Sequence, residues 1–416
     1  MDILIKNGIL RNKQYPVNIG IANGKITNIV PANSEDIPEE AGEIIDSDGS
    51  LVASTFIDPH LHMDKALIAE EVRDNVSGTL NEAIEIIWNK KKDYSVKEVI
   101  NRATRVVKMG LINGTTKFRT NVDIDTIVGL TALEGLLEVK ENFSDTAEIQ
   151  IVAFPQEGIY KDPGTDKLMK EAMKQGADVV GGMPYNELTE EDSKKHIDFC
   201  FHLAKKFDAA IDMHVDETDD PGARTLQYLA AKTIRENYQQ RVTAGHTCAL
   251  AAYDESYAAT VIDMVARAKM NMITNPATNL MLQGRMDQEP KRRGITRVKQ
   301  LLAAGVNVAY GQDCIKDTFY PTWGKEDMLE VGLITAHAAQ LTQPNEIETL
   351  FDMPTLNSAK IMGINDYGIQ EGNPANLNVI DAPNVQEAFR KSADRLYVIS
   401  NGKVIAATET NTRLNI

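Results

Sequence analysis

The amino-acid sequence predicts an α/β fold, a TIM-like (β/α)8 barrel with a small β-sandwich built from both termini. Between about Leu51 and Ile364, short apolar runs alternate with longer stretches of 3.6-residue periodicity, as in successive βα units. Both ends of the chain instead show short alternating strands separated by turn dipeptides. We therefore expect residues 1–52 and 367–416 to form the sandwich and residues 53–366 to form the barrel.

The sandwich strands are predicted from Asn-Gly dipeptides, which adopt positive φ easily and so suit two-residue hairpin turns. Asn7-Gly8 and Asn23-Gly24 punctuate the first fifty residues. Near the other end, Asn401-Gly402 separates strand-like runs at 395–400 and 403–408, and a further run lies at 376–380. Two β-rich ends around a different middle indicate one small domain made from both.

Eight candidate strands in the middle of the chain are enough for a complete barrel, because right-handed crossovers close eight βα units into one parallel sheet. The active site of such a barrel lies at the C-terminal ends of its strands. The predicted strands span residues 51–57, 115–121, 149–154, 178–183, 209–214, 241–246, 271–275 and 306–311.

The composition is that of a globular protein with a substantial core, since 43% of residues are hydrophobic and 25% are charged. Sixty acidic residues against 44 lysines and arginines give a net charge of −16, which makes a nucleic-acid partner improbable. Charges interrupt every apolar run of the opening MDILIKNGILRNKQ, so neither a signal peptide nor a membrane partner is expected. We expect a cytoplasmic homo-oligomer that acts on a small molecule.

The three cysteines, Cys200, Cys248 and Cys314, are far apart and show no CxxC spacing. This pattern argues against a disulfide framework and against a zinc site made of thiolates, so we expect the cysteines to be reduced. It also excludes the zinc deaminases that carry an H-x-E and P-C-x-x-C signature.

Polar residues with metal-ligand or carboxamide side chains follow strand after strand. The first predicted strand runs into PHLHMDK, the third into FPQEG, the fifth into HVDE, the sixth into GHT and the eighth into GQD. The ends of barrel strands converge on one mouth, so these side chains are expected to share one site.

Histidines are concentrated at these strand ends. His60 and His62 are two residues apart, so on an extended strand they point the same way and can bind one ion. His214 and His246 end two further strands, which places four of the seven histidines at the mouth. The other three, which lie in helical stretches and are predicted to be structural, are His196, His202 and His337.

A metal ligand and a proton-carrying group occur together in the segment DMHVDE, where Glu217 follows His214 by three residues. Hydrolytic deamination needs both a hydroxide generated by a metal and a group that carries protons to the ring nitrogen and the leaving ammonia. Asp313, at the end of the eighth strand, can complete a mixed nitrogen and oxygen shell. The sequence therefore predicts a metal site with hydrolytic chemistry.

Several motifs carry a resemblance to the bacterial cytosine deaminase branch of the metal-dependent amidohydrolase superfamily, and the similarity extends over nearly the whole chain. The motifs are HLHMDK, IVAFPQEG, HVDETDD, GHTCAL, NLMLQGR, PKRRGITRVKQLL, the GQD strand end, and the closing GNPANLNVI and NGKVIA. The resemblance implies one divalent metal ion per chain, zinc or iron.

The resemblance also implies roles for individual residues. It assigns the metal to His60, His62, His214 and Asp313. Glu217 is implied as the proton shuttle, and His246 as the residue that orients the hydroxide, so that Glu217, His246 and Asp313 form the catalytic group. Gln156, whose carboxamide offers a donor and an acceptor, is expected to bind the ring edge, and Phe154 to pack on the ring plane.

The sequence departs from enteric cytosine deaminases at four positions. Their His-Asp-Asp run at the eighth strand is replaced by Gln312-Asp313-Cys314, so the second carboxylate that faces the ring is absent. Phe319 stands in place of a tryptophan, and Lys65 in place of a small hydroxyl residue. HxHxDK is similar instead to relatives that act on creatinine-like or substituted aminotriazine rings. Two readings of Lys65 stay open, a substrate contact and an ion pair with Asp64 or another acid.

We therefore expect deamination of a small cytosine-like N-heterocycle by a metal-bound hydroxide, with Phe154, Gln156, Lys65, Cys314 and Phe319 contacting the substrate. An aminohydrolase for creatinine, isocytosine or a substituted aminotriazine is the alternative. A cyclic-amide hydrolase with two metals is less favoured, because the fourth strand, DVVGGMPYNE, has no bridging lysine. A thiol hydrolase using Cys314 and His246, and a binding protein without activity, are the weakest alternatives.

Overall fold

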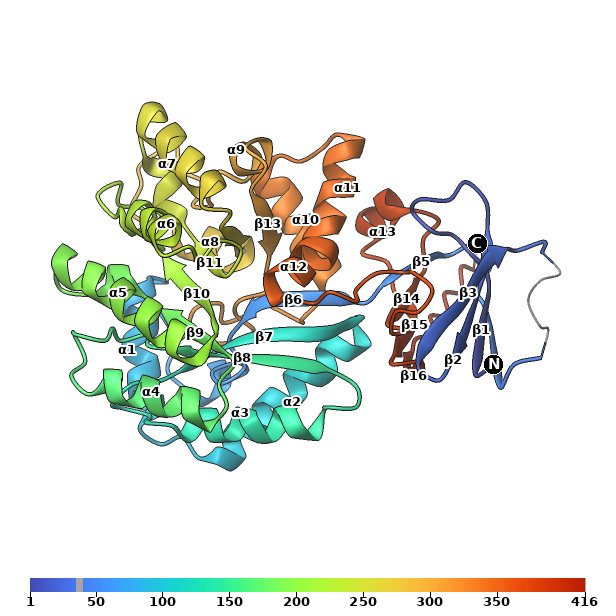
Figure 1. Ribbon diagram of the computed structural model, residues 1–416, viewed down its shortest axis with the longest axis horizontal. Helices are drawn as coiled ribbons and strands as arrows, with labels where there is room; N and C mark the ends of the chain where they lie inside the picture. Colours follow the sequence, from blue (N-terminus) through green and yellow to red (C-terminus); the bar gives the residue numbers. More distant parts are fainter. Residues whose placement is uncertain (35–39, 416) are drawn as a thin grey trace.

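The protein consists of a barrel and a smaller β-sandwich that contains both ends of the chain (Figure 1). The structure, a computed structural model, describes residues 1–34 and 40–415. Over these residues no helix combines the length and the apolar character needed to cross a membrane. The predicted barrel and sandwich are both confirmed.

Eight parallel strands form the barrel sheet in sequence order, β6 to β13, with each strand hydrogen-bonded to the next. An isolated parallel bridge between Leu61 and Asp313 joins the first strand to the segment after the last one. The strands are β6 (Phe56–Leu61), β7 (Thr115–Asp123), β8 (Glu148–Phe154), β9 (Val179–Gly182), β10 (Ala210–Val215), β11 (Val242–His246), β12 (Asn271–Thr274) and β13 (Asn307–Tyr310).

Helices connect the barrel strands and bury one apolar face each. In α2, Val99, Ala103 and Val106 recur at helical spacing on the buried side, and the Ser95 side chain caps the first turn by accepting from the Glu98 backbone N–H. The α-helices are α1 (Leu80–Lys91), α2 (Val96–Ile112), α3 (Thr131–Asn142), α4 (Thr165–Gln175), α5 (Glu190–Phe207), α6 (Thr225–Arg235), α7 (Glu255–Arg267), α8 (Pro276–Leu282), α9 (Val298–Ala303), α10 (Met328–Ala339), α11 (Pro344–Asp352), α12 (Ser358–Met362) and α13 (Val385–Lys391).

The sandwich has two four-stranded sheets, ordered β3-β2-β1-β4 and β16-β15-β14-β5. Apolar side chains from both sheets, such as Ile5, Ile19 and Val379, form one buried cluster between them. The strands are β1 (Ile3–Gly8), β2 (Val17–Ala22), β3 (Lys25–Pro31), β4 (Glu43–Asp46), β5 (Leu51–Ser54), β14 (Leu377–Ile380), β15 (Arg395–Ser400) and β16 (Lys403–Ala407).

Two details of the sequence prediction are wrong. The run 51–57 is not one barrel strand, because β5 pairs antiparallel with β14 in the sandwich and only β6 enters the barrel. Asn7-Gly8 is not a hairpin turn but lies within β1, where the register with β2 shifts and Asn7 has a φ of 59°. Asn23-Gly24 and Asn401-Gly402 do connect adjacent antiparallel strands, as predicted.

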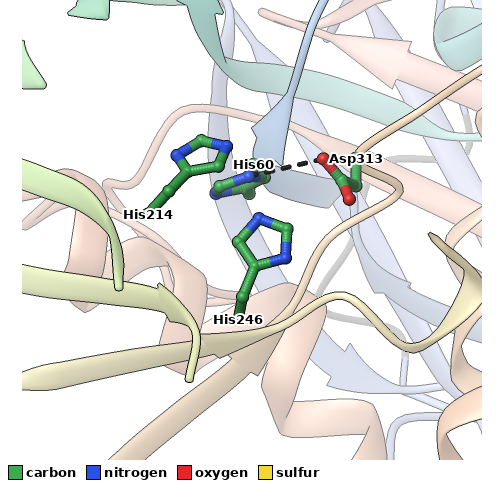
Figure 2. Close-up of side chains that lie close together, drawn as sticks. All are labelled: His60, His214, His246 and Asp313. Atoms are coloured by element: carbon green, nitrogen blue, oxygen red, sulfur yellow. Dashed lines mark ion pairs between the residues drawn. The ribbon is translucent and has the colours of Figure 1, made fainter. Parts of the chain in front are cut away.

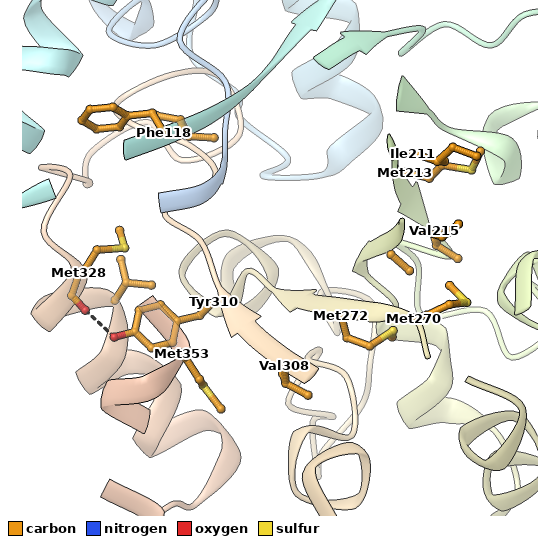
Figure 3. Close-up of a cluster of buried hydrophobic side chains, with 14 of the residues drawn as sticks. Phe118, Ile211, Met213, Val215, Met270, Met272, Val308, Tyr310, Met328 and Met353 are labelled. Carbon is orange, nitrogen blue, oxygen red and sulfur yellow. Dashed lines mark hydrogen bonds between the residues drawn. The ribbon is translucent and has the colours of Figure 1, made fainter. Parts of the chain in front are cut away.

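A continuous apolar core that includes several methionines packs around the barrel strands (Figure 3). Met213 and Met272 come from barrel strands, and Met328 and Met353 from the segments that pack outside them. The buried Tyr310 satisfies its hydroxyl by donating to the Met328 carbonyl at 2.9 Å. This packing holds the strand ends in fixed positions.

Barrel closure is very tight at Gly311, which follows β13. A Cβ atom on this residue would lie 2.6 Å from the His60 carbonyl oxygen and 2.8 Å from the His60 Cβ. Only a residue without a side chain therefore allows β6 and the segment after β13 to approach this closely.

Replacing Gly311 with alanine is expected to lower the free energy of unfolding by about 1–3 kcal/mol, because the added methyl group must displace β6. Thermal unfolding followed by circular dichroism measures this as a lower Tm. Gly20→Ala in β2 is the matched control, since its Cβ would meet only side-chain atoms at 3.2 Å or more. An unchanged Tm for Gly311→Ala would contradict the tight closure.

Candidate active site

Four histidines and one aspartate converge at the C-terminal ends of the barrel strands. Ligand atoms of His60, His214, His246 and Asp313 all lie within 4.8 Å of one another (Figure 2). His62, directly after β6, joins them, because its Nε2 lies 3.0 Å from the His214 Nε2 and 3.4 Å from the Asp313 Oδ1. The structure therefore brings together every residue predicted to bind or adjoin the metal.

Backbone pairing fixes the relative positions of these side chains. The Asp313 N–H donates to the His60 carbonyl at 2.8 Å, and the His62 N–H donates to the Asp313 carbonyl at 3.0 Å. His246 and Asp313 both have a φ of 66°, a backbone conformation that is uncommon for residues other than glycine. Such strained positions often occur at functional sites, where surrounding structure holds them in place.

The electrostatics of the cluster suit a divalent cation. Burial lowers the pKa of His62 to about 4 and that of His246 to about 3, and it lowers the pKa of His214 well below its usual value. Burial alone would raise the pKa of Asp313, but the neighbouring imidazoles outweigh it and hold that pKa well below normal. Neutral imidazoles of His62, His214 and His246 thus lie beside a carboxylate, and these are the protonation states in which such groups bind metals.

Unpaired polar atoms provide a test of whether a metal fits. Both ring nitrogens of His60, the Nδ1 atoms of His62 and His214, and the Asp313 Oδ2 are buried and have no hydrogen-bond partner among the described residues. Such groups are costly to bury unless something binds them. A nitrogen-rich set with one carboxylate is typical of zinc and iron sites, so the residues present fit such an ion.

His246 differs from the other imidazoles because an asparagine side chain lies within hydrogen-bond distance of each of its ring nitrogens. Its Nε2 lies 3.1 Å from the Asn275 Nδ2, and its Nδ1 lies 3.0 Å from the Asn279 Nδ2. These two asparagines fix the plane of the ring.

Glu217 lies beside His246 at the same mouth. Its Oε1 is 3.2 Å from the His246 Nδ1 and accepts from the Asn279 amide at 3.3 Å, while the Tyr185 hydroxyl donates to its Oε2 at 3.4 Å. The pKa of Glu217 is raised well above its usual value, mainly by burial and secondly by the negative charge of Asp313. Glu217 is therefore a buried carboxyl group next to the histidine and aspartate cluster.

A small cavity adjoins the cluster, and a larger open groove on the protein surface meets it at Leu80 and Glu217. Leu80 and Ile84 of α1 cover one side of the cavity. All five residues predicted to contact substrate line it, namely Lys65, Phe154, Gln156, Cys314 and Phe319.

Phe154 also has a contact that the sequence does not indicate. Its ring stacks on the His214 imidazole, with centroids 4.1 Å apart and an angle of 27° between the planes. Phe154 therefore supports a predicted metal ligand as well as forming part of the cavity wall.

Lys65 has an acidic partner, but it is not Asp64. The Nζ atom lies 2.7 Å from the Asp123 Oδ1 and also donates to the Gln156 Oε1. Burial alone would lower the pKa of Lys65, but Asp123 and Asp64 outweigh it and raise the pKa, so the side chain is a buried cation at the cavity wall. The ion pair with another acid is therefore observed, and a contact of Lys65 with substrate stays a prediction, for which the lysine is placed in the cavity wall.

Cys314 is a neutral thiol in the cavity wall. Burial, and next the charge of Asp313, raises its pKa well above the usual value. Since a thiolate is the nucleophilic form of cysteine, this environment speaks against the thiol hydrolase alternative.

Sequence reasoning missed four residues that contact the predicted site residues. Asp123 ends β7 and Asn275 follows β12. Polar residues at the C-terminal ends of barrel strands converge on the mouth, so applying this expectation to every strand would have found both. Asn279 lies one turn into α8, and Tyr185 in a short 3-10 helix after β9, where no periodic pattern marks them.

Comparisons with known proteins agree with this site. A family model described as the amidohydrolase family matches residues 119–406. The chain belongs to the amidohydrolase family. The predicted resemblance to the cytosine deaminase branch is confirmed, and the protein is an enzyme of the hydrolase class that acts on carbon–nitrogen bonds of cyclic compounds.

Individual relatives cover nearly the whole amidohydrolase chain. A crystal structure of 5-methylcytosine deaminase from Klebsiella pneumoniae, liganded with 5-fluorocytosine, is 37% identical with a TM-score of 0.95, covering 99% of each chain. N-isopropylammelide isopropyl amidohydrolase of Pseudomonas sp. (strain ADP) is 30% identical and covers 98% of both chains. Pterin deaminase of Rhizobium rhizogenes is 32% identical over 93% of this chain and 87% of its own.

Removing one ligand from the cluster should release the metal. We expect His214→Asn and Asp313→Asn to reduce the content of divalent metal from about one ion per chain to a small fraction, because the remaining ligands no longer form a closed set. Elemental analysis of purified protein measures this. His202→Asn is the control, since His202 is exposed on α5. Full metal content in both site variants would contradict the assignment.

Proposed function

We propose that this amidohydrolase deaminates a small cytosine-like N-heterocycle by hydrolysis, releasing ammonia. The observation that carries the proposal is the cavity itself, because three histidines and the aspartate of the cluster line one small space together with Glu217 and Gln156. These four cluster residues are His62, His214, His246 and Asp313. The likeness over full length to 5-methylcytosine deaminase supports it. A non-catalytic binding protein would have no need to keep a metal-type cluster next to a buried proton carrier.

In this proposal His60, His62, His214 and Asp313 hold one divalent metal, and His246 stays outside the ligand set. The compact group of ligand atoms contains His246 and not His62. We assign His62 to the ligand set in its place, because an asparagine amide lies next to each His246 ring nitrogen, whereas the His62 Nδ1 has no hydrogen-bond partner among the described residues. When bound, a divalent ion supplies a water nucleophile that ionises near neutral pH. Zinc and iron are both compatible with this donor set.

Glu217 carries protons in the proposed reaction. Overall, water adds its oxygen to the ring carbon, the bond to the exocyclic amino group breaks, and ammonia leaves. Glu217 takes one proton from the water and delivers it to the ring nitrogen. It then takes the second proton from the added hydroxyl group and delivers it to the leaving amine, so that the ring carbonyl forms as ammonia departs. His246 contacts the Glu217 Oε1 through its Nδ1 at 3.2 Å, and we propose that it orients the water by exchanging one of its asparagine contacts for the water.

The substrate is proposed to be a cytosine with a small apolar substituent, such as 5-methylcytosine. Cys314 presents a small neutral group where the enteric cytosine deaminases present a carboxylate, and its neighbours in the cavity include Phe319. Such a wall accommodates a methyl group without leaving a charge unpaired. The solved 5-methylcytosine deaminase is the relative that motivates this ring.

A substituted aminotriazine is the second candidate substrate. The N-isopropylammelide hydrolase that matches 98% of the chain acts on such a ring by its name, and Lys65 places a cation at the cavity wall. The released amine separates the two candidates, since deamination of a cytosine gives ammonia and hydrolysis of an N-alkylated triazine gives an alkylamine. We propose no two-metal cyclic-amide hydrolysis, because β9 carries no lysine.

Glu217→Gln should reduce kcat by about 10²- to 10⁴-fold, because the amide keeps the size of the carboxyl group but cannot shuttle a proton. Steady-state ammonia release measures kcat, and elemental analysis serves as the internal control, since metal content should stay normal. Retention of full kcat by a metal-loaded Glu217→Gln protein would assign the proton transfer to another group.

Cys314→Asp should shift preference from 5-methylcytosine toward cytosine by roughly one to two powers of ten in kcat/KM, because the carboxylate offers a ring N–H a strong acceptor and disfavours an apolar substituent. The measurement is a kcat/KM series over cytosine, 5-methylcytosine, isocytosine, creatinine and aminotriazines. Cys314→Asn, which has the shape of aspartate without its charge, is the control. Cytosine as the best wild-type substrate, with no gain in Cys314→Asp, would show that residue 314 does not determine specificity.

A further inference from the structure

The contact between Lys65 and Gln156 restricts the orientation of the Gln156 amide. A lysine ammonium has only donors, so the Gln156 atom that faces its Nζ must be the carbonyl oxygen. Rotating the amide by 180° would turn its N–H groups toward a cation. An isolated glutamine exchanges these two orientations freely, whereas this one has a single favourable orientation.

Lys65 is itself held by a buried network of alternating charges. Asp123 accepts from Lys65 through its Oδ1 at 2.7 Å and from Lys91 through its Oδ2 at 3.0 Å. Lys91, at the end of α1, also donates to the Asp125 Oδ2 at 2.6 Å and to the Glu157 Oε1 at 2.9 Å. All these side chains are buried, so each cation depends on its carboxylate partners and none can turn away cheaply.

The loop that carries Gln156 is fixed as well. The Asn186 amide donates to the Gln156 carbonyl oxygen of the backbone at 2.7 Å, and Glu157, the next residue, belongs to the charged network. Gln156 is 4% exposed and lines the cavity, and its Nε2 has no hydrogen-bond partner among the described residues. A buried amide nitrogen without a partner at a cavity wall points to a ligand atom that accepts hydrogen bonds.

We propose that Lys65 is a positioning and specificity residue that fixes Gln156 as a hydrogen-bond donor, so that the enzyme recognises a ring carbonyl at this wall. This inference rests on the proposed function and narrows its substrate class. The recognised ring carries an acceptor, a carbonyl oxygen, where Gln156 reaches it. A ring with an amino group at that position would place N–H groups against N–H groups.

The test compares two rings on the metal-loaded enzyme: cytosine, and 2,4-diaminopyrimidine, which carries an amino group in place of the ring carbonyl. Wild type is expected to favour cytosine in kcat/KM. In Lys65→Met this preference should fall about ten- to a hundredfold, because the amide is then free to rotate and satisfy either ring. The preference within one variant is independent of the folded fraction, so a merely structural role of Lys65 would not change it.

Binding provides a second readout that does not depend on turnover. Calorimetric titration with uracil, which keeps the carbonyl and has no amino group to lose, should show weaker binding to Lys65→Met than to wild type, with metal content unchanged. Lys140→Met is the matched control, because Lys140 makes the same 2.7 Å contact with an aspartate, Asp178, away from the cavity. An unchanged preference together with unchanged uracil affinity in Lys65→Met would overturn the inference.

Gln156→Glu keeps the inference testable if Lys65→Met does not fold. The glutamate retains the contact with Lys65 as an ion pair but replaces the donor with an acceptor, so uracil binding should be lost while the metal is kept. Uracil affinity equal to wild type would overturn the inference. Failure of the proposed function looks different, since wild type would then neither release ammonia from either ring nor bind uracil.

Discussion

The site depends on how the barrel closes. The first and last strands meet through backbone hydrogen bonds that involve His60, His62 and Asp313, so the residues that join the sheet also present the metal-type side chains. Closure at this point requires the close approach permitted by Gly311. The geometry of the cluster is therefore a property of the barrel as a whole and not of a flexible loop.

The fold was largely predictable because its two periodicities are clear in the sequence. Seven of the eight barrel strands, β7 to β13, coincide with predicted apolar runs, and the strand-end rule places His60, His62, His214, His246 and Asp313 at one mouth. The run at 51–57 was misassigned for a physical reason. β5 and the first two residues of β6, Phe56 and Ile57, form one nearly continuous buried apolar run, so composition alone does not show that the chain passes from one domain to the other within it.

The partners of the site residues were harder to predict than the residues themselves. Lys65 pairs with Asp123, 58 positions away, and His246 with asparagines from the segment after β12. Such pairings depend on which strand ends are neighbours and on the register between them, and spacing along the chain does not contain that information. The orientation of the Gln156 amide belongs to the same class, because it follows from a contact between two strand ends.

The sandwich has a consequence for the order in which the protein folds. Its core combines Ile5 and Ile19 with Leu377 and Val379. The core therefore cannot form until the C-terminal strands have been synthesised and have returned to the N-terminal ones. Contacts across so many residues carry a large loop-closure cost unless the intervening chain is already compact. Folding of the barrel therefore brings the two ends of the chain together. Until the C-terminal strands have been synthesised, the apolar face of the N-terminal strands stays uncovered. An exposed apolar face of this kind is prone to aggregation during synthesis.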